Sequence, residues 1–261
     1  MLTEWADFVK MGVMSTSEGA AAAPSWGRRL VAEFVGTGAL VAVVVGSGIA
    51  AQRLSPGDVG LQLLENSLAT TLGLAVLIVV LGPVSGAHLN PVVSLADWYL
   101  ARKTGGGLTP RGVGAYLAAQ CAGGVAGAVL ANVMFDVPTA LATTQRTGTG
   151  VLVAEVVATA GLVVVIFSLT RSGRSALAAP AVGAYLGAAY WFPSSTSFAN
   201  PAVTLGRIFT DTFAGIAPPA APPFVLAQLL GAALGIAAVL VLYPGSAERQ
   251  PETVRAAALV R

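Results

Sequence analysis

Two stretches of six residues nearly repeat each other: NPVVSL at residues 90–95 and NPAVTL at residues 200–205. Proline is favoured at the first position of a helix, so each stretch predicts a helix that begins at its proline. Each stretch lies in a connection, residues 83–109 or 193–223, that is too long and too apolar for a plain loop. We therefore expect two half-length helices in an otherwise apolar chain.

The composition indicates an integral membrane protein. Of the 261 residues, 55% are hydrophobic and only 10% are charged, with a mean hydropathy of +0.77. An average soluble domain has about 25% charged residues, so a disordered chain and an ordinary soluble enzyme are excluded. The net charge of +2 excludes a nucleic-acid partner. The chain has one cysteine, Cys121, and one histidine, His88. These numbers exclude a disulfide framework within the chain and a metal site built from cysteines or several histidines. We expect no cofactor.

Six segments meet or approach the length of about 20 apolar residues that a membrane-spanning helix needs. They are residues 30–51, 63–82, 112–135, 151–170, 176–192 and 224–243. The fifth is the weakest, because it is short and contains Pro180. The sequence therefore predicts an all-α membrane protein with six transmembrane helices and two re-entrant half-helices.

The two halves of the chain match each other. VAEFV at residues 31–35 pairs with VAEVV at 153–157, and Gln120 pairs with Gln228 in a similar apolar setting. Each half holds three spans, an odd number, so the second half crosses the membrane in the opposite direction. We expect a cytoplasmic tail at 1–27, one domain at 28–243 with repeats at 28–135 and 150–243, and a second tail at 244–261.

Basic residues near the helix ends predict the orientation. If the N-terminus is inside, the inner segments carry Lys10, Arg28, Arg29, Arg102, Lys103, Arg111, Arg171, Arg174, Arg249, Arg255 and Arg261. The outer segments carry only Arg53, Arg146 and Arg207. This imbalance places both termini of the multi-pass chain in the cytoplasm.

An inverted repeat of half-helices has a physical consequence at the middle of the bilayer. Each helix N-terminus carries roughly half a positive charge. Two such ends that converge, with Asn90 and Asn200 offering amide donors, would orient water or hydroxylated solutes and repel cations. Glu33 and Glu155 lie within apolar helices, where we expect them to accept hydrogen bonds from backbone amides of the re-entrant loops. Ordinary helix capping is the simpler interpretation of each asparagine, but the pattern occurs twice, in register with a repeated Glu and Gln.

SGAHLNPVVS at residues 85–94 resembles the first signature of the aquaporin, or major intrinsic protein, family, and NPA at 200–202 resembles the second. The resemblance covers about residues 28–243. It implies one pore per subunit, a homotetramer, and passive conduction of water or small neutral solutes without cofactor or catalysis. It also implies a pore centre formed by Asn90, Pro91, Val92, Asn200, Pro201 and Ala202. The pore-lining carbonyls that it implies are those of Gly86, Ala87, His88, Thr196, Ser197 and Phe198.

The sequence departs from the family pattern at the expected selectivity filter. Val92 stands where the family usually has alanine, and Val203 stands where it usually has arginine. Counting from the signatures gives a filter of Thr70, Ala188, Ser197 and Val203, with Thr71 as the alternative to Thr70. Such a filter would be wide and without a fixed cation. We therefore expect glycerol, urea and arsenous acid to pass in addition to water.

Residues 194–203 and 206–211 resemble a bacterial branch of the family associated with arsenic resistance, which suggests a bacterial inner membrane. Within these residues, Arg207 follows Val203 by one helical turn. It would supply a positive charge at the outer mouth of the pore, or else form an ion pair with Asp211. His88 is either a proton-linked gate or, as we favour, a ring packed beside the first re-entrant loop.

Three other functions compete with a solute channel. A water-selective aquaporin is the nearest alternative. A secondary transporter shares the inverted repeat with broken helices, but it generally needs an ion-coordinating centre, and here the buried acids form one matched pair. An intramembrane enzyme is the most remote, because the single histidine has no plausible serine partner.

Overall fold

The structure, a computed structural model, describes residues 23–102 and 106–244. It is built from helices alone, and no strand occurs in these two ranges. The α-helices are α2 (Trp26–Leu54), α3 (Val59–Ser85), α4 (Pro91–Ala101), α5 (Pro110–Met134), α6 (Thr149–Arg171), α7 (Ala178–Ala189), α8 (Pro201–Gly206) and α9 (Ala221–Leu242). Short 3-10 turns at Ser175–Leu177, Arg207–Phe209 and Pro218–Ala220 adjoin α7, α8 and α9. The prediction of an all-α membrane fold is confirmed.

Five helices, α2, α3, α5, α6 and α9 with its preceding turn, are long and apolar enough to cross a membrane. The fifth predicted span, residues 176–192, is shorter than expected, because α7 has only 12 residues. At 1.5 Å per residue it rises about 18 Å, less than the roughly 30 Å of a bilayer core. The backbone amides of Trp191 and Phe192 both donate hydrogen bonds to the Ala188 carbonyl, which closes the end of α7. The chain then enters the second re-entrant segment.

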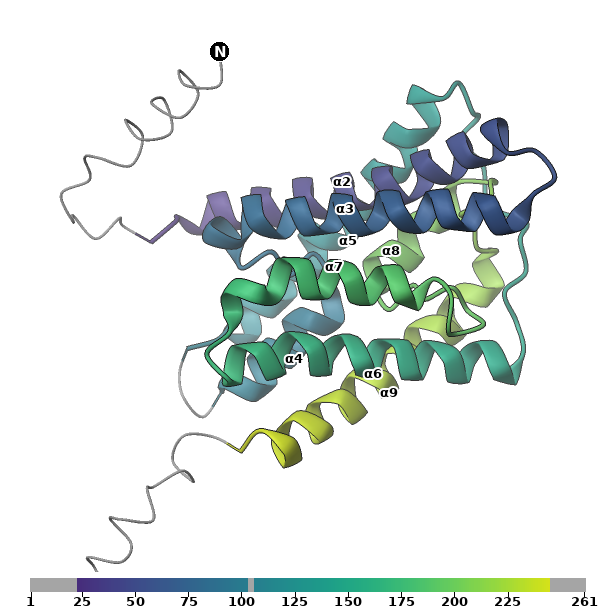
Figure 1. Cartoon of the computed structure of the whole chain (residues 1–261). Coiled ribbons are helices and arrows are strands. Elements are labelled where there is room, and N and C mark those ends of the chain that lie inside the picture. The colour runs from purple at the N-terminus through teal and green to yellow at the C-terminus, as the bar shows by residue number, and fades with distance from the viewer. Residues whose placement is uncertain (1–22, 103–105, 245–261) are drawn as a thin grey trace, which may run out of the picture.

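The boundaries of two helices differ slightly from the expected ones. Helix α2 begins at Trp26, inside the predicted tail 1–27, and α6 begins at Thr149, one residue before the predicted second repeat. Most of both predicted tails, residues 1–22 and 245–261, lies outside the described residues. Figure 1 shows α2 beginning and α9 ending on the same side of the bundle, which we call the terminal side.

Both Asn-Pro stretches start helices as expected. The Asn90 side chain accepts a hydrogen bond from the Val92 amide at 3.0 Å, and Pro91 occupies the first turn of α4. The Asn200 side chain accepts from the amides of Ala202 and Val203, at 2.9 and 3.3 Å, at the start of α8. Helix capping is therefore one role of each asparagine.

Glycines bring the long helices into close contact at two equivalent crossings. A Cβ atom on Gly127 of α5 would collide with the backbone of Gly38 in α2. In the second half, a Cβ atom on Gly235 of α9 would lie 2.7 Å from the Ala160 carbonyl oxygen of α6. Small residues permit this approach of helix backbones in a membrane. The crossings hold the two halves of the repeat in the same internal arrangement.

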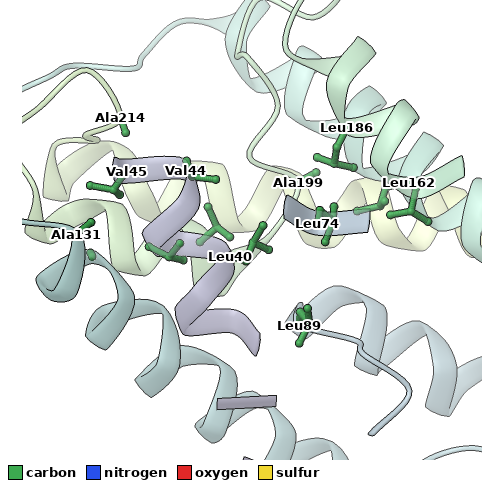
Figure 2. Close-up of a cluster of buried hydrophobic side chains, with 14 of the residues drawn as sticks. Leu40, Val44, Val45, Leu74, Leu89, Ala131, Leu162, Leu186, Ala199 and Ala214 are labelled. Atoms are coloured by element: carbon green, nitrogen blue, oxygen red, sulfur yellow. The ribbon is translucent and has the colours of Figure 1, made fainter. Parts of the chain in front are cut away.

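The largest cluster of buried apolar side chains lies between the long helices and the two re-entrant loops. Figure 2 shows side chains of this cluster that come from α2, α3, α6 and α7, together with Leu89 and Ala199 from the loops before α4 and α8. Leu40 of α2 and Leu162 of α6 occupy equivalent positions in the two halves, each two turns after the repeated glutamate of its helix. About half of the buried residues of this cluster line the cavity described next.

Candidate functional site: a lumen between two re-entrant hairpins

The tips of the two hairpins are joined by a reciprocal pair of hydrogen bonds. The Asn90 side-chain amide donates to the Ala199 carbonyl at 2.8 Å, and the Asn200 amide donates to the Leu89 carbonyl at 2.8 Å. Each amide carries two hydrogens, so one donor of each remains after this pairing. Both asparagines are nearly buried and both line one cavity.

Glu33 is fully buried and holds the first hairpin in place. One carboxylate oxygen accepts from the Ser85 hydroxyl at 2.7 Å and the His88 amide at 3.0 Å. The other accepts from the Leu89 amide and the Gln120 side chain, each at 2.7 Å. Four hydrogen bonds satisfy the carboxylate, which is the condition for burying such a group without a cation.

Glu155 repeats the arrangement in the second hairpin. Its oxygens accept from the Ser195 hydroxyl at 2.7 Å, the Phe198 and Ala199 amides at 2.8 and 3.0 Å, and the Gln228 side chain at 2.9 Å. The two serines were missed by reasoning from the sequence. Their signal was their equal spacing, since Ser85 and Ser195 each precede the Asn-Pro asparagine by five residues.

The carboxylates hold a strained backbone in both hairpins. Ala87 and Leu89 have φ angles of 46° and 49°, and the equivalent Ser197 and Ala199 have φ angles of 48° and 47°. Left-handed conformations of residues other than glycine cost about 1–2 kcal/mol each. The bonds to Glu33 and Glu155 provide the compensating stabilisation. Positive φ angles therefore occur at equivalent positions in the two hairpins, as expected for an inverted repeat.

A cavity of about 560 Å³ passes between the hairpins and the long helices. Asp97, Thr170 and Ser175 line it near the terminal side, and Tyr190 and Arg207 line it toward the opposite side. The wall between these ends is mostly apolar, and Asn90 and Asn200 interrupt it. Apolar residues that contribute to this wall are Leu40, Val44, Leu74, Leu162, Ile166, Val182 and Leu186.

Three of the four residues expected in the filter line this cavity: Thr70, Ser197 and Val203. The alternative to Thr70 is wrong, because Thr71 instead packs against Gly187 of α7. Ala188 does not appear in the cavity wall, which contains Tyr190. The Tyr190 hydroxyl lies 2.9 Å from the Thr70 hydroxyl, so an aromatic ring reaches α3 at this level.

The pore-centre residues other than the asparagines lie behind the wall. Val92 is fully buried in a second apolar cluster, with Phe167 and Val239 among its members, and does not narrow the lumen. Pro91, Pro201 and Ala202 are also buried and absent from the wall. Of the six residues whose carbonyls we expected to line the pore, Thr196 is absent from the wall and the other five contribute to it.

Arg207 lines the cavity, which agrees with the interpretation that places its charge at the pore and not in a surface ion pair. Its side chain is 4% exposed, its Nε–H donates to the Ala214 carbonyl, and its Cζ lies 3.5 Å from the centroid of the Phe198 ring. The ion pair with Asp211 is not formed, since one Asp211 oxygen accepts from both the amide and the hydroxyl of Thr143. The interpretation of Arg207 as half of a surface ion pair is therefore wrong.

A second arginine lies on the same ring. The Cζ atom of Arg146 is 5.2 Å from the centroid of Phe198, and its guanidinium donates to the Gly215 and Phe213 carbonyls at 2.9 and 3.1 Å. Arg146 belongs to the loop between α5 and α6, where burial lowers the pKa of its guanidinium below the usual value. Two cations therefore lie close together at this end of the lumen.

His88 occupies the terminal side of the lumen. Its Nδ1 lies 3.1 Å from the Ser94 hydroxyl, and its ring meets that of Tyr116 edge-on at 5.4 Å between centroids. His88 is among the residues that line the cavity. The contacts of its ring with Ser94 and Tyr116 agree with the interpretation of a ring packed beside the first re-entrant loop.

A sequence profile of the family described as major intrinsic protein matches residues 21–195. The chain is 50% identical to aquaglyceroporin AqpS of Rhizobium meliloti (strain 1021) over 80% of its own length and 88% of that protein. It is 33% identical to the glycerol uptake facilitator protein of Pseudomonas aeruginosa, with 91% and 99% of the two chains covered. The crystal structure of the aquaglyceroporin from Plasmodium falciparum shares the fold, with a TM-score of 0.59 at 22% identity and coverage of 82% of this chain and 96% of that one. These similarities, together with the paired Asn-Pro hairpins, show that the chain belongs to the major intrinsic protein family.

Proposed function

We propose that this protein is a passive channel for glycerol and other small neutral solutes, including urea, arsenous acid and water. The observation that carries the proposal is the lumen of about 560 Å³ with the paired asparagines in its wall. The names of the relatives, an aquaglyceroporin and a glycerol uptake facilitator, support glycerol as a solute.

The wall suits solutes that have one apolar and one hydroxylated face. Leu74 and Leu162 offer apolar contact, and Asn90 and Asn200 each keep one amide hydrogen for a passing hydroxyl. The N-termini of α4 and α8 begin at these asparagines. Their partial positive charges oppose the passage of cations, protons included.

We assign selectivity to Thr70, Tyr190, Ser197, Val203 and Arg207. Ser197 lines the cavity through its other atoms, because its hydroxyl is fully buried and has no hydrogen-bond partner among the described residues. Val203 provides an apolar surface. The contact between the Tyr190 and Thr70 hydroxyls determines the width of the lumen between the end of α7 and α3. Tyr190 takes the place in this set that the family comparison gave to Ala188.

Stopped-flow light scattering on proteoliposomes tests the channel. Water, glycerol, urea and arsenous acid are compared without any ion gradient. A flux that rises linearly with the solute gradient supports a channel, whereas saturable flux that requires an ion gradient overturns it in favour of a secondary transporter. Water flux without flux of the three solutes would favour a water-selective aquaporin.

Two leucines of α3 offer a matched pair of blocking variants. Leu74 lines the lumen and is 7% exposed, whereas Leu72 lies two residues away and is 60% exposed. Leu74→Trp is expected to abolish flux of every solute, because the added ring fills the lumen. Leu72→Trp adds the same ring on the outer surface and is expected to conduct normally. Equal conduction by both variants would place the solute path elsewhere.

We further propose that the protein is a homotetramer in a bacterial cytoplasmic membrane, with the terminal side facing the cytoplasm. Exposed apolar side chains on α3, among them Leu64, Leu68 and Val76, provide surface for lipid or for a second subunit. The mass of the detergent-solubilised protein, measured by light scattering with subtraction of the detergent, tests the tetramer. A monomer would contradict it.

A further inference from the structure

Arg207 is a buried cation without a carboxylate partner. Its side chain is 4% exposed, and no ion pair involves it within residues 23–102 and 106–244. The acid nearest to it along its own segment, Asp211, is bound to Thr143. Glu155 acts on Arg207 electrostatically, but both of its carboxylate oxygens accept hydrogen bonds from the second hairpin. A buried charge normally has a partner, so this guanidinium needs an explanation.

The guanidinium keeps most of its donors free. Only the Nε–H is hydrogen-bonded, to the Ala214 carbonyl, and one face of the group lies on the Phe198 ring. The two terminal nitrogens have no acceptor in the described part of the chain, and they are not among its fully buried unpaired atoms. Because Arg207 lines the lumen, these donors are open to whatever occupies the cavity.

A second unsatisfied group lies nearby but does not reach the lumen. The Ser197 hydroxyl is fully buried without a hydrogen-bond partner in the described ranges, and Ser197 directly precedes Phe198, the ring on which Arg207 lies. The charge around this point is positive, because Arg146 lies over the same ring and Glu155 is the one acid acting on both arginines. The wall thus presents an unpaired cation in positive surroundings.

We propose that Arg207, in the positive surroundings that Arg146 supplies, forms a binding site for a small oxyanion of the phosphate type, and that the bound anion blocks the lumen to neutral solutes. The proposal rests on the channel function proposed above. A guanidinium binds two oxygens of such an anion with two parallel hydrogen bonds. Two charge-assisted bonds of this kind support a dissociation constant on the order of 1 mM.

The anion is expected to stop at this site instead of passing through. Beyond Arg207 the wall is dominated by apolar side chains such as Leu74, Leu162 and Leu186. An ion that leaves its guanidinium partner for an apolar wall loses hydration without an equivalent replacement. A glycerol-sized neutral solute carries no such cost, so an anion at Arg207 acts as a reversible plug.

The test measures glycerol flux in phosphatidylcholine vesicles with inorganic phosphate on both faces, so that protein orientation does not matter. Potassium chloride holds the ionic strength constant, and the lipid supplies no anionic headgroup. Each protein is normalised to its own flux without phosphate. At ten times the dissociation constant, the flux of the wild type is expected to fall roughly tenfold.

Three variants resolve the role of the side chain. Arg207→Gln removes the charge and is expected to abolish the sensitivity to phosphate, and Arg207→Lys, a point charge, is expected to weaken it. The matched control is Arg53→Gln. Arg53 also lies over a phenylalanine ring, with its Cζ 5.4 Å from the centroid of Phe135, but it is exposed and outside the lumen. This control is expected to keep the full response.

Binding of phosphate is measured separately, by ³¹P NMR line broadening on the wild type in detergent. Broadening that saturates in the wild type and is lost in Arg207→Gln supports the site even if that variant conducts poorly. Glycerol flux that phosphate does not alter, with no broadening, overturns this inference and leaves the channel standing. Phosphate inhibition of equal size in Arg207→Gln also overturns it. A wild type without glycerol flux would instead overturn the proposed channel.

Discussion

At the scale of single residues, two carboxylates stabilise left-handed backbone conformations that glycine would adopt more easily. Ala87, Leu89, Ser197 and Ala199 adopt left-handed conformations that few side chains tolerate. They persist because Glu33 and Glu155 each bind amides of the adjoining hairpin. The geometry of the lumen therefore depends on two acids that do not line it.

Glu155→Gln tests this dependence. The amide group would face the donors of Ala199 and Gln228, so at least two buried donors lose their acceptor, at an expected cost of roughly 2–5 kcal/mol in stability. The variant should melt well below the wild type in detergent and lose glycerol flux. Glu65→Gln is the control, because Glu65 accepts one bond, from the Ser55 hydroxyl. Equal melting temperatures for the two variants would contradict the role of Glu155.

Val203→Arg tests the residue that departs from the family pattern. Val203 lines the lumen close to Arg207, so a second arginine adds both length and like charge there. If these add about 1.4 kcal/mol to the barrier for glycerol, its flux falls tenfold. Water, which is smaller, should be spared.

Val203→Met separates bulk from charge in the same stopped-flow assay, since methionine is long but neutral. If glycerol or arsenous acid passes through Val203→Arg as readily as through the wild type, the proposed filter is wrong.

At the scale of elements, stability depends on how closely two pairs of helices cross. Gly127 and Gly38 meet where α5 crosses α2, and Gly235 meets Ala160 where α9 crosses α6. Lipid tails are as apolar as leucine, so helix association in a membrane depends on close packing more than on the hydrophobic effect. These crossings support the helices that carry Glu33 and Glu155.

Gly127→Ala should therefore destabilise the protein. The added Cβ atom would collide with the Gly38 backbone, and forcing the helices apart is expected to cost about 1–3 kcal/mol. Gly114→Ala, on the same helix, is the control because nothing lies within 4 Å of the position that its Cβ atom would take. Thermal unfolding followed by size-exclusion chromatography compares them, and an equal melting temperature for both would argue against a tight crossing.

At the scale of the whole molecule, the inverted halves bring the described start and end of the chain to one side of the bundle (Figure 1). Arg29, Arg111 and Arg171 lie near helix ends on this terminal side, whereas Arg53 ends α2 on the opposite side. Cytoplasmic segments carry the excess of basic residues. The terminal side is therefore expected to face the cytoplasm.

Labelling of single cysteines checks this orientation in whole bacterial cells, with the native thiol removed as Cys121→Ser. Gln145→Cys lies in the exposed loop between α5 and α6 and should react with a membrane-impermeant maleimide. Arg174→Cys lies in the loop between α6 and α7 and should react after permeabilisation only. The reverse pattern would invert the predicted topology.

Much of this architecture is already contained in the sequence. The Asn-Pro pairs, the repeated Glu and Gln, and the odd number of spans per half predict re-entrant hairpins related by inversion. These features are recoverable because they are local: a proline starts a helix wherever it lies, and a buried acid needs donors at a fixed offset. Duplication supports each local prediction with a second copy.

The sequence named Thr70, Ser197 and Val203 in the wall of the lumen, but the tertiary structure alone decided which long side chains reach it. Counting along the chain chose Ala188, but α7 ends early and Tyr190 reaches Thr70 instead. The sequence also left two positions open for Arg207, the mouth of the pore or an ion pair with Asp211, and the structure places it in the cavity wall, on Phe198. Spacing fixes the position of a Cα atom, but a long side chain covers a surface well away from its own Cα. The motif residues at the tips of the hairpins therefore follow from the sequence, whereas the long side chains around them depend on how the helices pack.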